Sequence, residues 1–440
     1  MVAKRDNAAM TAPKTLADWL AYIEGQHPKA IDMGLERCRE VARRMGLTAP
    51  ARRVVTVGGT NGKGSTVAFV EAIARAAGWR VGAYTSPHLL RYNERVRIDG
   101  RDADDQALIA AFQAVEAARA GRDDAPVPLT YFEFGTLAAL KLFAERDLDL
   151  AVLEVGLGGR LDAVNLVDAD VAVVTTVDLD HQDWLGDTIE AIGFEKAGIA
   201  RAWKPLILGD DDPPSSVLGH AYAIGASALR VGCDFFFEPD HDHPTRWHWR
   251  ELGFALQLPM PALRAPVQLR NAAVAIAAVR ALPGSEDWDE AVYARGIAQA
   301  RVAARLQRFQ RDGREIWVDV GHNPQAARAL AQALRAAPVA GRTHAVFAAL
   351  GDKDLAGVVE ALAGAIDTWR IAGLGDAGPR GLPVQAFAER LQGSAAADAA
   401  RAPDVTQALA AACAAADAGD RILVFGSFFT AAAALRALNG

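Results

Sequence analysis

The segment at residues 54–66 constrains the fold of this chain more than any other. It reads Val-Val-Thr-Val-Gly-Gly-Thr-Asn-Gly-Lys-Gly-Ser-Thr, a β-branched run that breaks into glycines before an alanine-rich stretch expected to be helical over 66–77. A strand, a glycine loop and a helix in this order form a phosphate cradle, because backbone N–H groups and the positive end of the helix dipole converge on one anion. Lys63, expected as a surface-facing loop residue, can reach the terminal phosphates, and Ser65 or Thr66 can face Mg²⁺.

The spacing departs from the common phosphate-loop pattern G-x-x-x-x-G-K-[ST]. Val57 stands at the position of the first glycine, and Gly64 separates Lys63 from the hydroxyl residues. Common kinases and GTPases keep the strict spacing, so the departure indicates a different class of nucleotide-binding protein. A glycine-rich turn that binds no phosphate is the alternative, but a lysine inside the turn favours the phosphate cradle.

Chain length and residue pattern predict two α/β domains. With 440 residues the chain exceeds the size at which one core keeps growing. Apolar β-rich runs alternate with helical stretches, which predicts a mostly parallel sheet with helices on both faces. A second series follows the arginine-rich stretch 301–314, so we expect a phosphate-loop (P-loop) domain over 1–300 and a smaller, Rossmann-like α/β domain over 301–440. The expected strands cover 54–57, 81–84, 150–155, 171–176 and 205–208, then 316–320, 345–349, 369–372 and 422–425. The expected second-domain helices cover 324–335, 355–365, 384–391 and 405–418, and 227–266 is expected to form short strands and loops.

Composition argues against several classes of protein. The net charge of −7 gives no basic surface of the kind that binds nucleic acid. No apolar run is long enough to span a bilayer, and residues 1–15 lack the apolar core of a signal peptide, so we expect no membrane partner and a cytoplasmic protein. Cys38, Cys233 and Cys413 are far apart and odd in number, which argues against disulfides and against a C-x-x-C metal site. We expect these cysteines to be buried fillers.

Two side chains follow expected strands at the sheet edge where open α/β sheets bind their ligands. Glu154 precedes a glycine loop and is a candidate Mg²⁺ ligand, because its carboxylate is a hard oxygen donor. A structural role, accepting hydrogen bonds from loop N–H groups, is an equal alternative. His181 is a second candidate, although histidine is an unusual Mg²⁺ ligand and a capping or hydrogen-bonded imidazole is favoured for this residue taken alone.

The segment 240–249 could suggest a zinc site, because it holds three histidines and two aspartates. The spacing of these residues beside a proline instead fits an exposed turn, and no matching set of ligands follows. We expect no functional metal there.

Further motifs are spread in order over almost the whole chain. They are Ile31–Leu35, Thr85–Leu89, Thr130–Thr136, Glu154–Ala163, Asp180–His181, Glu195–Ile199, Leu269–Ala273, Asp319–Pro324, Gly351–Asp354 and Gly426–Phe428. Together with the loop G-T-N-G-K-G-[ST], they resemble the folylpolyglutamate synthase/dihydrofolate synthase family of the Mur-ligase-like superfamily. The resemblance covers essentially the whole chain.

The resemblance also implies the roles of particular residues. It gives Lys63, Lys196 and His181 as catalytic residues, and Ser86, Glu154, His181 and Lys196 as ligands of two Mg²⁺ ions. It gives Thr60, Asn61, Gly62, Lys63, Gly64, Ser65, Asn271, Arg305 and Asp319 as ATP-binding residues. It gives Ile31, Asp32, Met33, Thr130, Tyr131, Phe132, Glu133, Leu161, Asp162 and Ala163 as the binding site for the pterin side of the substrate. His322 and Ser427 are candidates for glutamate binding or cleft closure.

Lys196 falls where the family carries a carbamylated lysine. Addition of CO₂ would convert a cation that repels Mg²⁺ into an anionic oxygen ligand. An ordinary pair of Glu195 and Lys196 on a helix surface is the alternative. The rings of Tyr131 and Phe132 would offer flat apolar faces to a pterin, although aromatic residues in such a segment are more often part of a core.

The function implied by the resemblance is ATP-dependent amide ligation through an acyl phosphate. The enzyme would add L-glutamate to dihydropteroate and to reduced folates, acting as a monomer on small molecules. A synthase that extends folates only, or a non-catalytic nucleotide-binding protein of the same fold, is the alternative. A cell-wall Mur ligase would carry a further domain before its loop, whereas only about fifty residues precede this one.

Several positions depart from the family's pattern. The family often has alanine at Gly58 and Gly321, histidine at Phe429, and Pro-Gly where Ala303 and Ala304 stand. The loss of Pro-Gly leaves the conformation of the linker near Arg305 open.

Overall fold

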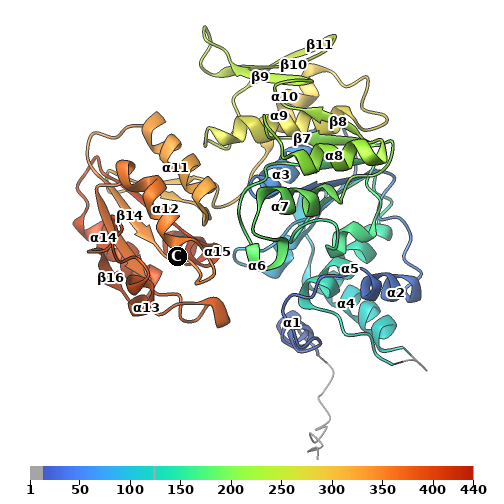
Figure 1. The fold of residues 1–440 in the computed structure, drawn as a ribbon, viewed down its shortest axis with the longest axis horizontal. Helices are drawn as coiled ribbons and strands as arrows, with labels where there is room; N and C mark the ends of the chain where they lie inside the picture. The colour runs from blue at the N-terminus through green and yellow to red at the C-terminus, as the bar shows by residue number, and fades with distance from the viewer. Residues whose placement is uncertain (1–12, 122–124, 440) are drawn as a thin grey trace, which may run out of the picture.

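The larger of two mostly parallel sheets lies in the N-terminal two thirds of the chain (Figure 1). The computed structural model describes residues 13–121 and 125–439. Eight strands of these residues form the sheet in the order β4-β3-β2-β5-β1-β6-β7-β8. All neighbours are parallel except the edge pairs of β2 with β3 and of β3 with β4, so the predicted mostly parallel sheet is confirmed. The strands are β1 (Val54–Gly58), β2 (Val81–Tyr84), β3 (Val96–Ile98), β4 (Arg101–Asp102), β5 (Leu150–Glu154), β6 (Val171–Val174), β7 (Pro205–Leu208) and β8 (Ser227–Arg230).

Helices cover both faces of this sheet, as expected from strands that are apolar on both sides. One face packs Leu153 and Val174 against α1 (Leu16–Glu24), α2 (Glu36–Arg44), α4 (Asp105–Ala120), α5 (Tyr131–Ala144), α7 (Ile189–Ala197) and α8 (Ser215–Ile224). The other packs Val57 and Val173 against α3 (Lys63–Ala76), α9 (Val267–Arg280) and α10 (Glu290–Gln299). The carboxyl ends of β1, β5 and β6 therefore lie at one edge of the sheet, between the two layers of helices.

A small antiparallel sheet covers α9 and α10. It consists of β9 (Phe235–Pro239), β10 (Arg246–Glu251) and β11 (Phe254–Pro259), and it buries Trp247 and Trp249 completely. Segment 240–249 is thus an exposed turn only in its first half, because its second half lies in β10. Asp240 serves this turn by accepting the backbone N–H groups of Asp242 and His243. Within the described ranges, no three His, Cys, Asp or Glu residues are grouped closely enough to hold a metal ion.

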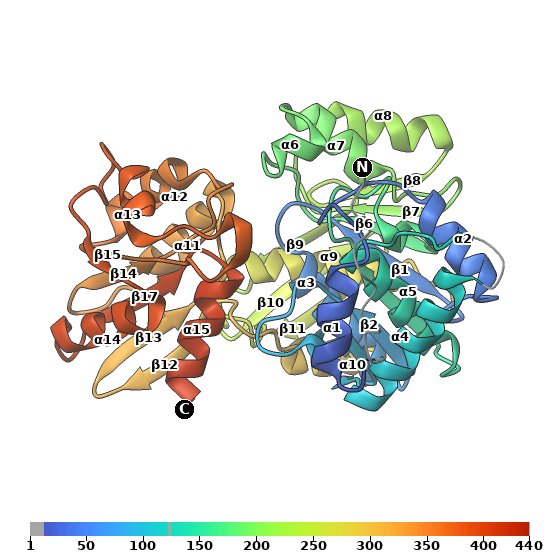
Figure 2. The same ribbon diagram turned by 90° about the horizontal axis from the view of Figure 1, so that it is seen from below.

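The second mostly parallel sheet forms a separate α/β unit beside the first unit (Figure 2). Its described strands follow the order β12-β13-β17-β14-β15-β16, and only the edge pair of β12 with β13 is antiparallel. Helices again cover both faces. The elements are β12 (Gln307–Arg311), β13 (Arg314–Val318), α11 (Pro324–Ala336), β14 (Thr343–Phe347), α12 (Leu355–Leu362), β15 (Thr368–Ala372), α13 (Val384–Glu389), β16 (Ala400–Ala402), α14 (Val405–Ala415), β17 (Arg421–Phe425) and α15 (Phe428–Asn439). We propose 1–300 and 301–440 as the two domains, since α10 ends at Gln299 and β12 begins at Gln307.

Three details differ from the sequence-based expectations. Helix α3 begins at Lys63 rather than Thr66, so Lys63 is a half-buried first helical residue and not a surface loop residue. Cys38 is buried, but Cys413 is half-buried and Cys233 is exposed, so the prediction of buried fillers is wrong for Cys233. The arginine-rich stretch 301–314 includes strand β12. None of the described helices combines the length and the apolar composition needed to cross a bilayer.

Candidate active site

The loop between β1 and α3 has a shape that only glycine permits at two positions. Gly59 and Gly62 have φ values of 139° and 90°, in the region that residues with a Cβ avoid. A Cβ on Gly59 would lie 1.9 Å from Thr175 Oγ1, and one on Gly62 would lie 2.6 Å from Asn271 Oδ1. The loop backbone is therefore pressed against its neighbours and turns sharply into the N-terminus of α3, as a phosphate-binding loop requires.

Residues after β6 hold this loop in place. The Thr60 N–H donates to Thr176 O at 2.7 Å, the Asn61 N–H donates to Thr176 Oγ1 at 3.1 Å, and the Thr175 hydroxyl donates to Asn61 O at 2.6 Å. The Lys63 ammonium folds back over the loop, donating to Gly59 O at 2.9 Å and Thr60 O at 3.1 Å. Burial lowers the pKa of Lys63, against the attraction of Glu154 and Asp180.

A cavity of about 130 Å³, which we call the phosphate cavity, opens above the loop. Gly59–Gly64 line it, and so do all four residues expected to hold Mg²⁺: Ser86, Glu154, His181 and Lys196. Arg305, His322 and Phe428 close it from the second unit. Ser65 is buried in α3 and does not belong to this lining.

Glu154 has the surroundings that a hard cation needs. It ends β5, is only 4% exposed, and accepts the Ser86 N–H through Oε2 at 3.0 Å. Its other oxygen, Oε1, lies 3.6 Å from the position that a Cβ on Gly64 would take, at the start of α3. Burial raises the pKa of Glu154, and the charges of Lys63 and Arg305 oppose that effect. A buried carboxylate beside the loop fits Mg²⁺, which prefers oxygen ligands.

Lys196 is buried rather than on a helix surface, which excludes the surface-pair alternative. Its side chain lines the phosphate cavity and is 4% exposed, whereas its neighbour Glu195 pairs with Arg160 at 2.8 Å. Burial, and next the charge of Lys63, lower the pKa of Lys196 to about 7. Much of the amine is then neutral at neutral pH, which is the form that can react with CO₂.

His181 projects from a strained backbone position. Its φ is 54°, unusual for a residue other than glycine, and it stands just before α6 (Gln182–Leu185). Burial and the charge of Lys353 lower the pKa of His181 to about 4, so the imidazole is neutral and has a nitrogen lone pair available.

Of the three nucleotide-site candidates outside the loop, only Arg305 lines the phosphate cavity, whereas Asn271 lies in α9 against the loop and Asp319 directly follows β13. Asn271 donates to Gln268 Oε1 at 3.0 Å, and its Oδ1 packs against Gly62. Asp319 accepts the N–H groups of Leu306 and Gly321, each at 2.7 Å. These bonds fix the linker around Arg305, where Ala304 and Leu306 both adopt positive φ, at 53° and 50°. Ala304 thus takes a conformation that suits glycine better.

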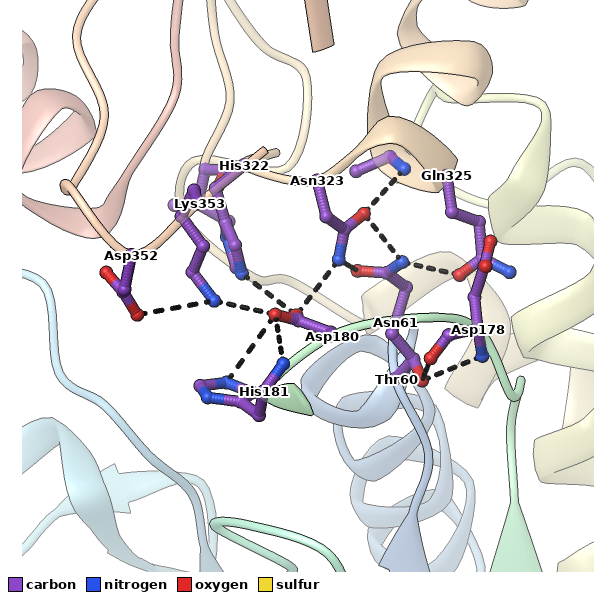
Figure 3. Close-up of polar contacts among 12 residues, drawn as sticks. Thr60, Asn61, Asp178, Asp180, His181, His322, Asn323, Gln325, Asp352 and Lys353 are labelled. Carbon is purple, nitrogen blue, oxygen red and sulfur yellow. Dashed lines mark hydrogen bonds and ion pairs between the residues drawn. The ribbon is translucent and has the colours of Figure 1, made fainter. Parts of the chain in front are cut away.

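A polar network joins the two units directly above the loop (Figure 3). Asp180 accepts from Lys353 Nζ at 2.7 Å and from Asn323 Nδ2 at 3.2 Å, and its Oδ2 lies 3.6 Å from His322 Nε2. Asn61 in turn donates to Asn323 Oδ1 at 3.1 Å. Although burial disfavours its charge, the hydrogen bond from His322 and the charge of Lys353 hold the pKa of Asp180 well below its usual range.

Sequence reasoning missed most of this network. Asp180, Asn323 and Lys353 stand in motifs of the sequence, but the sequence predicts no role for them, nor for Gln325, which accepts a hydrogen bond from Asn61 Nδ2 at 2.5 Å. The available signal was the occurrence of polar motifs directly after strands in both units. Those motifs show that the residues lie at sheet edges, but not that the two edges face each other.

A larger cavity of about 610 Å³, which we call the substrate cavity, lies beside the phosphate cavity. All ten residues predicted for the pterin side line it, and His322 and Ser427 do so from the second unit. Ser427 also caps α15 by accepting the Thr430 N–H at 3.0 Å. Phe132 packs its ring against Gly156 and 6.1 Å from the ring of Tyr84, so this aromatic residue lies at the boundary between core and cavity.

Some predicted substrate residues also have structural partners. Thr130 and Glu133 form a reciprocal cap at the start of α5, and Glu133 pairs with Arg37 at 3.0 Å. Asp162 accepts the N–H groups of Leu157 at 2.8 Å and Val164 at 3.0 Å. Even with these bonds, burial raises the pKa of Asp162 to about 7.

The family models assign this pair of α/β units, which meet at the phosphate cavity, to the Mur ligases. Residues 57–279 match the model of the Mur ligase middle domain, and residues 304–428 match the model of the Mur ligase, glutamate ligase domain. A dihydrofolate synthase/folylpolyglutamate synthase of Escherichia coli strain K12 is 45% identical over 430 residues, which cover 97% of this chain and 96% of that protein. The chain therefore belongs to the dihydrofolate synthase/folylpolyglutamate synthase family.

Solved structures agree with this assignment. The structure of E. coli FolC in complex with DHPP and ADP is 43% identical, with a TM-score of 0.89 over 97% of this chain and 98% of that one. A bifunctional folylpolyglutamate synthase/dihydrofolate synthase with Mn, AMPPNP and L-glutamate bound is 42% identical, with a TM-score of 0.87 and the same coverage.

Proposed function

We propose that this protein is an ATP- and Mg²⁺-dependent ligase that adds L-glutamate to dihydropteroate, giving dihydrofolate, and to reduced folates, giving polyglutamates. The observation that carries the proposal is that the phosphate and substrate cavities share a wall. Ser86, Pro87, Gly156, Leu157, His181, His322 and Phe428 line both. A carboxylate placed in the substrate cavity at this shared wall would therefore meet the terminal phosphate of a nucleotide bound to the loop.

The reaction proceeds in two steps. The acceptor carboxylate attacks the γ-phosphorus of ATP, forming an acyl phosphate and releasing ADP. The amine of glutamate then attacks the acyl carbon, the amide bond forms, and inorganic phosphate leaves. Lys63 and the loop N–H groups stabilise the charge on the transferring phosphoryl group. Binding of the nucleotide at the junction between the units would exclude water and so protect the reactive anhydride.

The metal-binding residues of the proposal are Ser86, Glu154, His181 and a carbamylated Lys196. Bound Mg²⁺ would supply charge neutralisation on the phosphoryl oxygens. Thr60–Gly64, Asn271, Arg305 and Asp319 would bind the nucleotide, and Arg305 also lines a neighbouring cavity of about 700 Å³. Action as a monomer and location in the cytoplasm stay predictions.

The test is release of ADP with L-glutamate and either dihydropteroate or tetrahydrofolate as acceptor. We expect release with each acceptor and none when the acceptor is omitted. Activity with tetrahydrofolate alone would favour the narrower alternative, a synthase that only extends folates. Nucleotide binding without release with either acceptor would favour the non-catalytic alternative.

A further inference from the structure

Arg95 is a buried cation in the wall of the substrate cavity. It closes the short 3₁₀ helix η1 (Tyr92–Arg95), lines the cavity, and is only 8% exposed. Its carbonyl accepts the Thr85 N–H at 2.9 Å, directly beside Ser86 on the wall shared by both cavities. Arg95 therefore lies near the end of the substrate cavity where the acceptor carboxylate must react.

Hydrogen bonds to Glu94 fix the turn before Arg95, so the carboxylate of Glu94 does not form an ion pair with the guanidinium of Arg95. Glu94 accepts the N–H groups of Leu89, Leu90 and Arg91 at 2.7–2.8 Å, so its carboxylate is committed to the backbone. Within residues 13–121 and 125–439, Arg95 forms no ion pair with any carboxylate. Its one side-chain hydrogen bond there runs from Nε to His88 Nδ1 at 2.9 Å.

The groups around the guanidinium fix its position without neutralising it. Its central carbon lies 5.3 Å from the ring centre of Tyr92 and 5.4 Å from that of Tyr131. Burial, and next the charge of Arg95, lower the pKa of His88 to about 4, so the imidazole is neutral and accepts the hydrogen bond. No residue in the described part of the chain accepts a hydrogen bond from Nη1 or Nη2. A buried cation without a counter-charge is unfavourable unless a ligand supplies one.

The two proposed acceptors differ in the negative charge that they bring to this place. Dihydropteroate carries one carboxylate, which reacts. A folate ends in glutamate and therefore carries two carboxylates, which a short carbon chain separates. One of them reacts, and the other, the bystander, does not. Since the reacting carboxylate must lie at the shared wall near Ser86, the bystander must lie close by.

We propose that Arg95 binds the non-reacting carboxylate of the terminal glutamate, and so serves chain extension of folates but not synthesis of dihydrofolate. A planar guanidinium can bind a carboxylate in a bidentate manner, through two parallel hydrogen bonds. The other arginines of the cavity suit this role less well, because Arg436 is exposed and Arg380 is exposed and paired with Asp352. This inference rests on the proposed function.

The first experiment compares Arg95→Met with Arg95→Lys and with the control Arg91→Met. Arg91 belongs to the same turn but is exposed and outside the cavity lining. For Arg95→Met we expect kcat/KM with tetrahydrofolate to fall about 10- to 100-fold, the range of a lost hydrogen bond to a charged group. The loss with dihydropteroate should be at least tenfold smaller. Arg95→Lys should show an intermediate loss confined to tetrahydrofolate, and Arg91→Met should match the wild type with both acceptors.

Equal loss with both acceptors, or loss with neither, would overturn the assignment of Arg95. Absence of both activities in the wild-type enzyme would instead overturn the proposed function, so the two failures are distinguishable.

The second experiment has a wild-type arm that does not depend on whether the variants fold. Tetrahydrofolate analogues are prepared in which one glutamate carboxylate at a time is a carboxamide, and the analogue that still reacts identifies the bystander group. Wild-type enzyme should use that analogue at least tenfold less efficiently than tetrahydrofolate, and Arg95→Met should use the two almost equally. A wild-type enzyme that treats both alike would contradict the proposal.

Discussion

At the scale of single residues, the phosphate cavity is an arrangement of charges kept away from water. Lys63 and Lys196 are close enough for the charge of the first to lower the pKa of the second, and the charge of Lys63 also acts on Glu154 in the wall of the same cavity. Such an arrangement is unfavourable on its own and becomes favourable when phosphates and metal ions complete it. The buried side chains of this cavity are therefore the place where substitutions separate activity from stability.

Lys63→Ala tests the cation of the loop. We expect ADP release to fall at least about 100-fold, the usual effect of removing one group that stabilises a transition-state charge. Because Nζ also bonds to Gly59 O and Thr60 O, the free energy of unfolding should fall by about 1–2 kcal/mol. Denaturant titration followed by circular dichroism measures this change, with the exposed Lys204→Ala as control. Near-normal ligase activity would contradict the assignment.

Lys196 tests the proposed carbamate. A crystal structure with nucleotide and Mg²⁺ should show density beyond Nζ, with an oxygen about 2.1 Å from a metal ion. Lys196→Ala should lose activity and regain part of it when a short carboxylic acid is supplied. An unmodified amine in the metal-loaded enzyme, together with an active Lys196→Ala variant, would show that the modification does not occur here.

At the scale of elements, the start of α3 is set by two neighbouring glycines with different roles. Gly62 has a left-handed backbone and no room for a Cβ, whereas Gly64 lies in the first turn of the helix, and a Cβ there would meet no atom closer than 3.6 Å. Substitution by alanine should therefore destabilise the protein at Gly62 but not at Gly64.

Gly62→Ala should lower the free energy of unfolding by about 1–3 kcal/mol, from left-handed strain and contact with Asn271. Gly64→Ala should leave it unchanged or raise it by up to about 1 kcal/mol, because alanine favours helix. Denaturant titration of both variants is the measurement. Equal effects of the two substitutions would show that the backbone of Gly62 is less constrained than its φ indicates.

The strand, loop and helix around Lys63 could be predicted because their signals are local: β-branched residues, then glycines, then alanines. The exact start of α3 could not, since Gly64 and Ser65 are weaker helix formers than the alanines that follow, and contacts of the loop with Thr175 and Asn271 decide where the helix begins. The ten residues predicted to bind the pterin side of the substrate follow from the family resemblance, not from a local signal. The partners of Asp180 could not be predicted, because they depend on how two separately packed units face each other.

At the scale of the whole molecule, Asp180 links the two units beside the site through three residues of the second unit. Its partners His322, Asn323 and Lys353 all belong to the second unit (Figure 3). Lys353 Nζ is almost buried with it, so neither charge has much water. Removing one member of such a pair is costly, because the other stays buried without a counter-charge.

Lys353→Met should therefore separate the units rather than unfold them, since separation lets water reach Asp180. We expect a larger radius of gyration by small-angle scattering and faster proteolysis at the linker, residues 301–306. Arg328→Met is the matched control: Arg328 also reaches across to Asp178, at 2.9 Å, but it is exposed, and exposed pairs contribute little. Scattering curves identical to the wild type would show that Asp180 and Lys353 do not hold the units together.

The wall shared by the two cavities has a consequence for inhibition. Both proposed reactions would pass the same few side chains on their way to the terminal phosphate, whichever acceptor fills the larger cavity. A compound seated against Ser86, Gly156 and His322 would block the first synthesis of the vitamin and its later elongation together. A substitution that prevents binding of such a compound would then have to preserve both activities, so few substitutions could make the enzyme resistant.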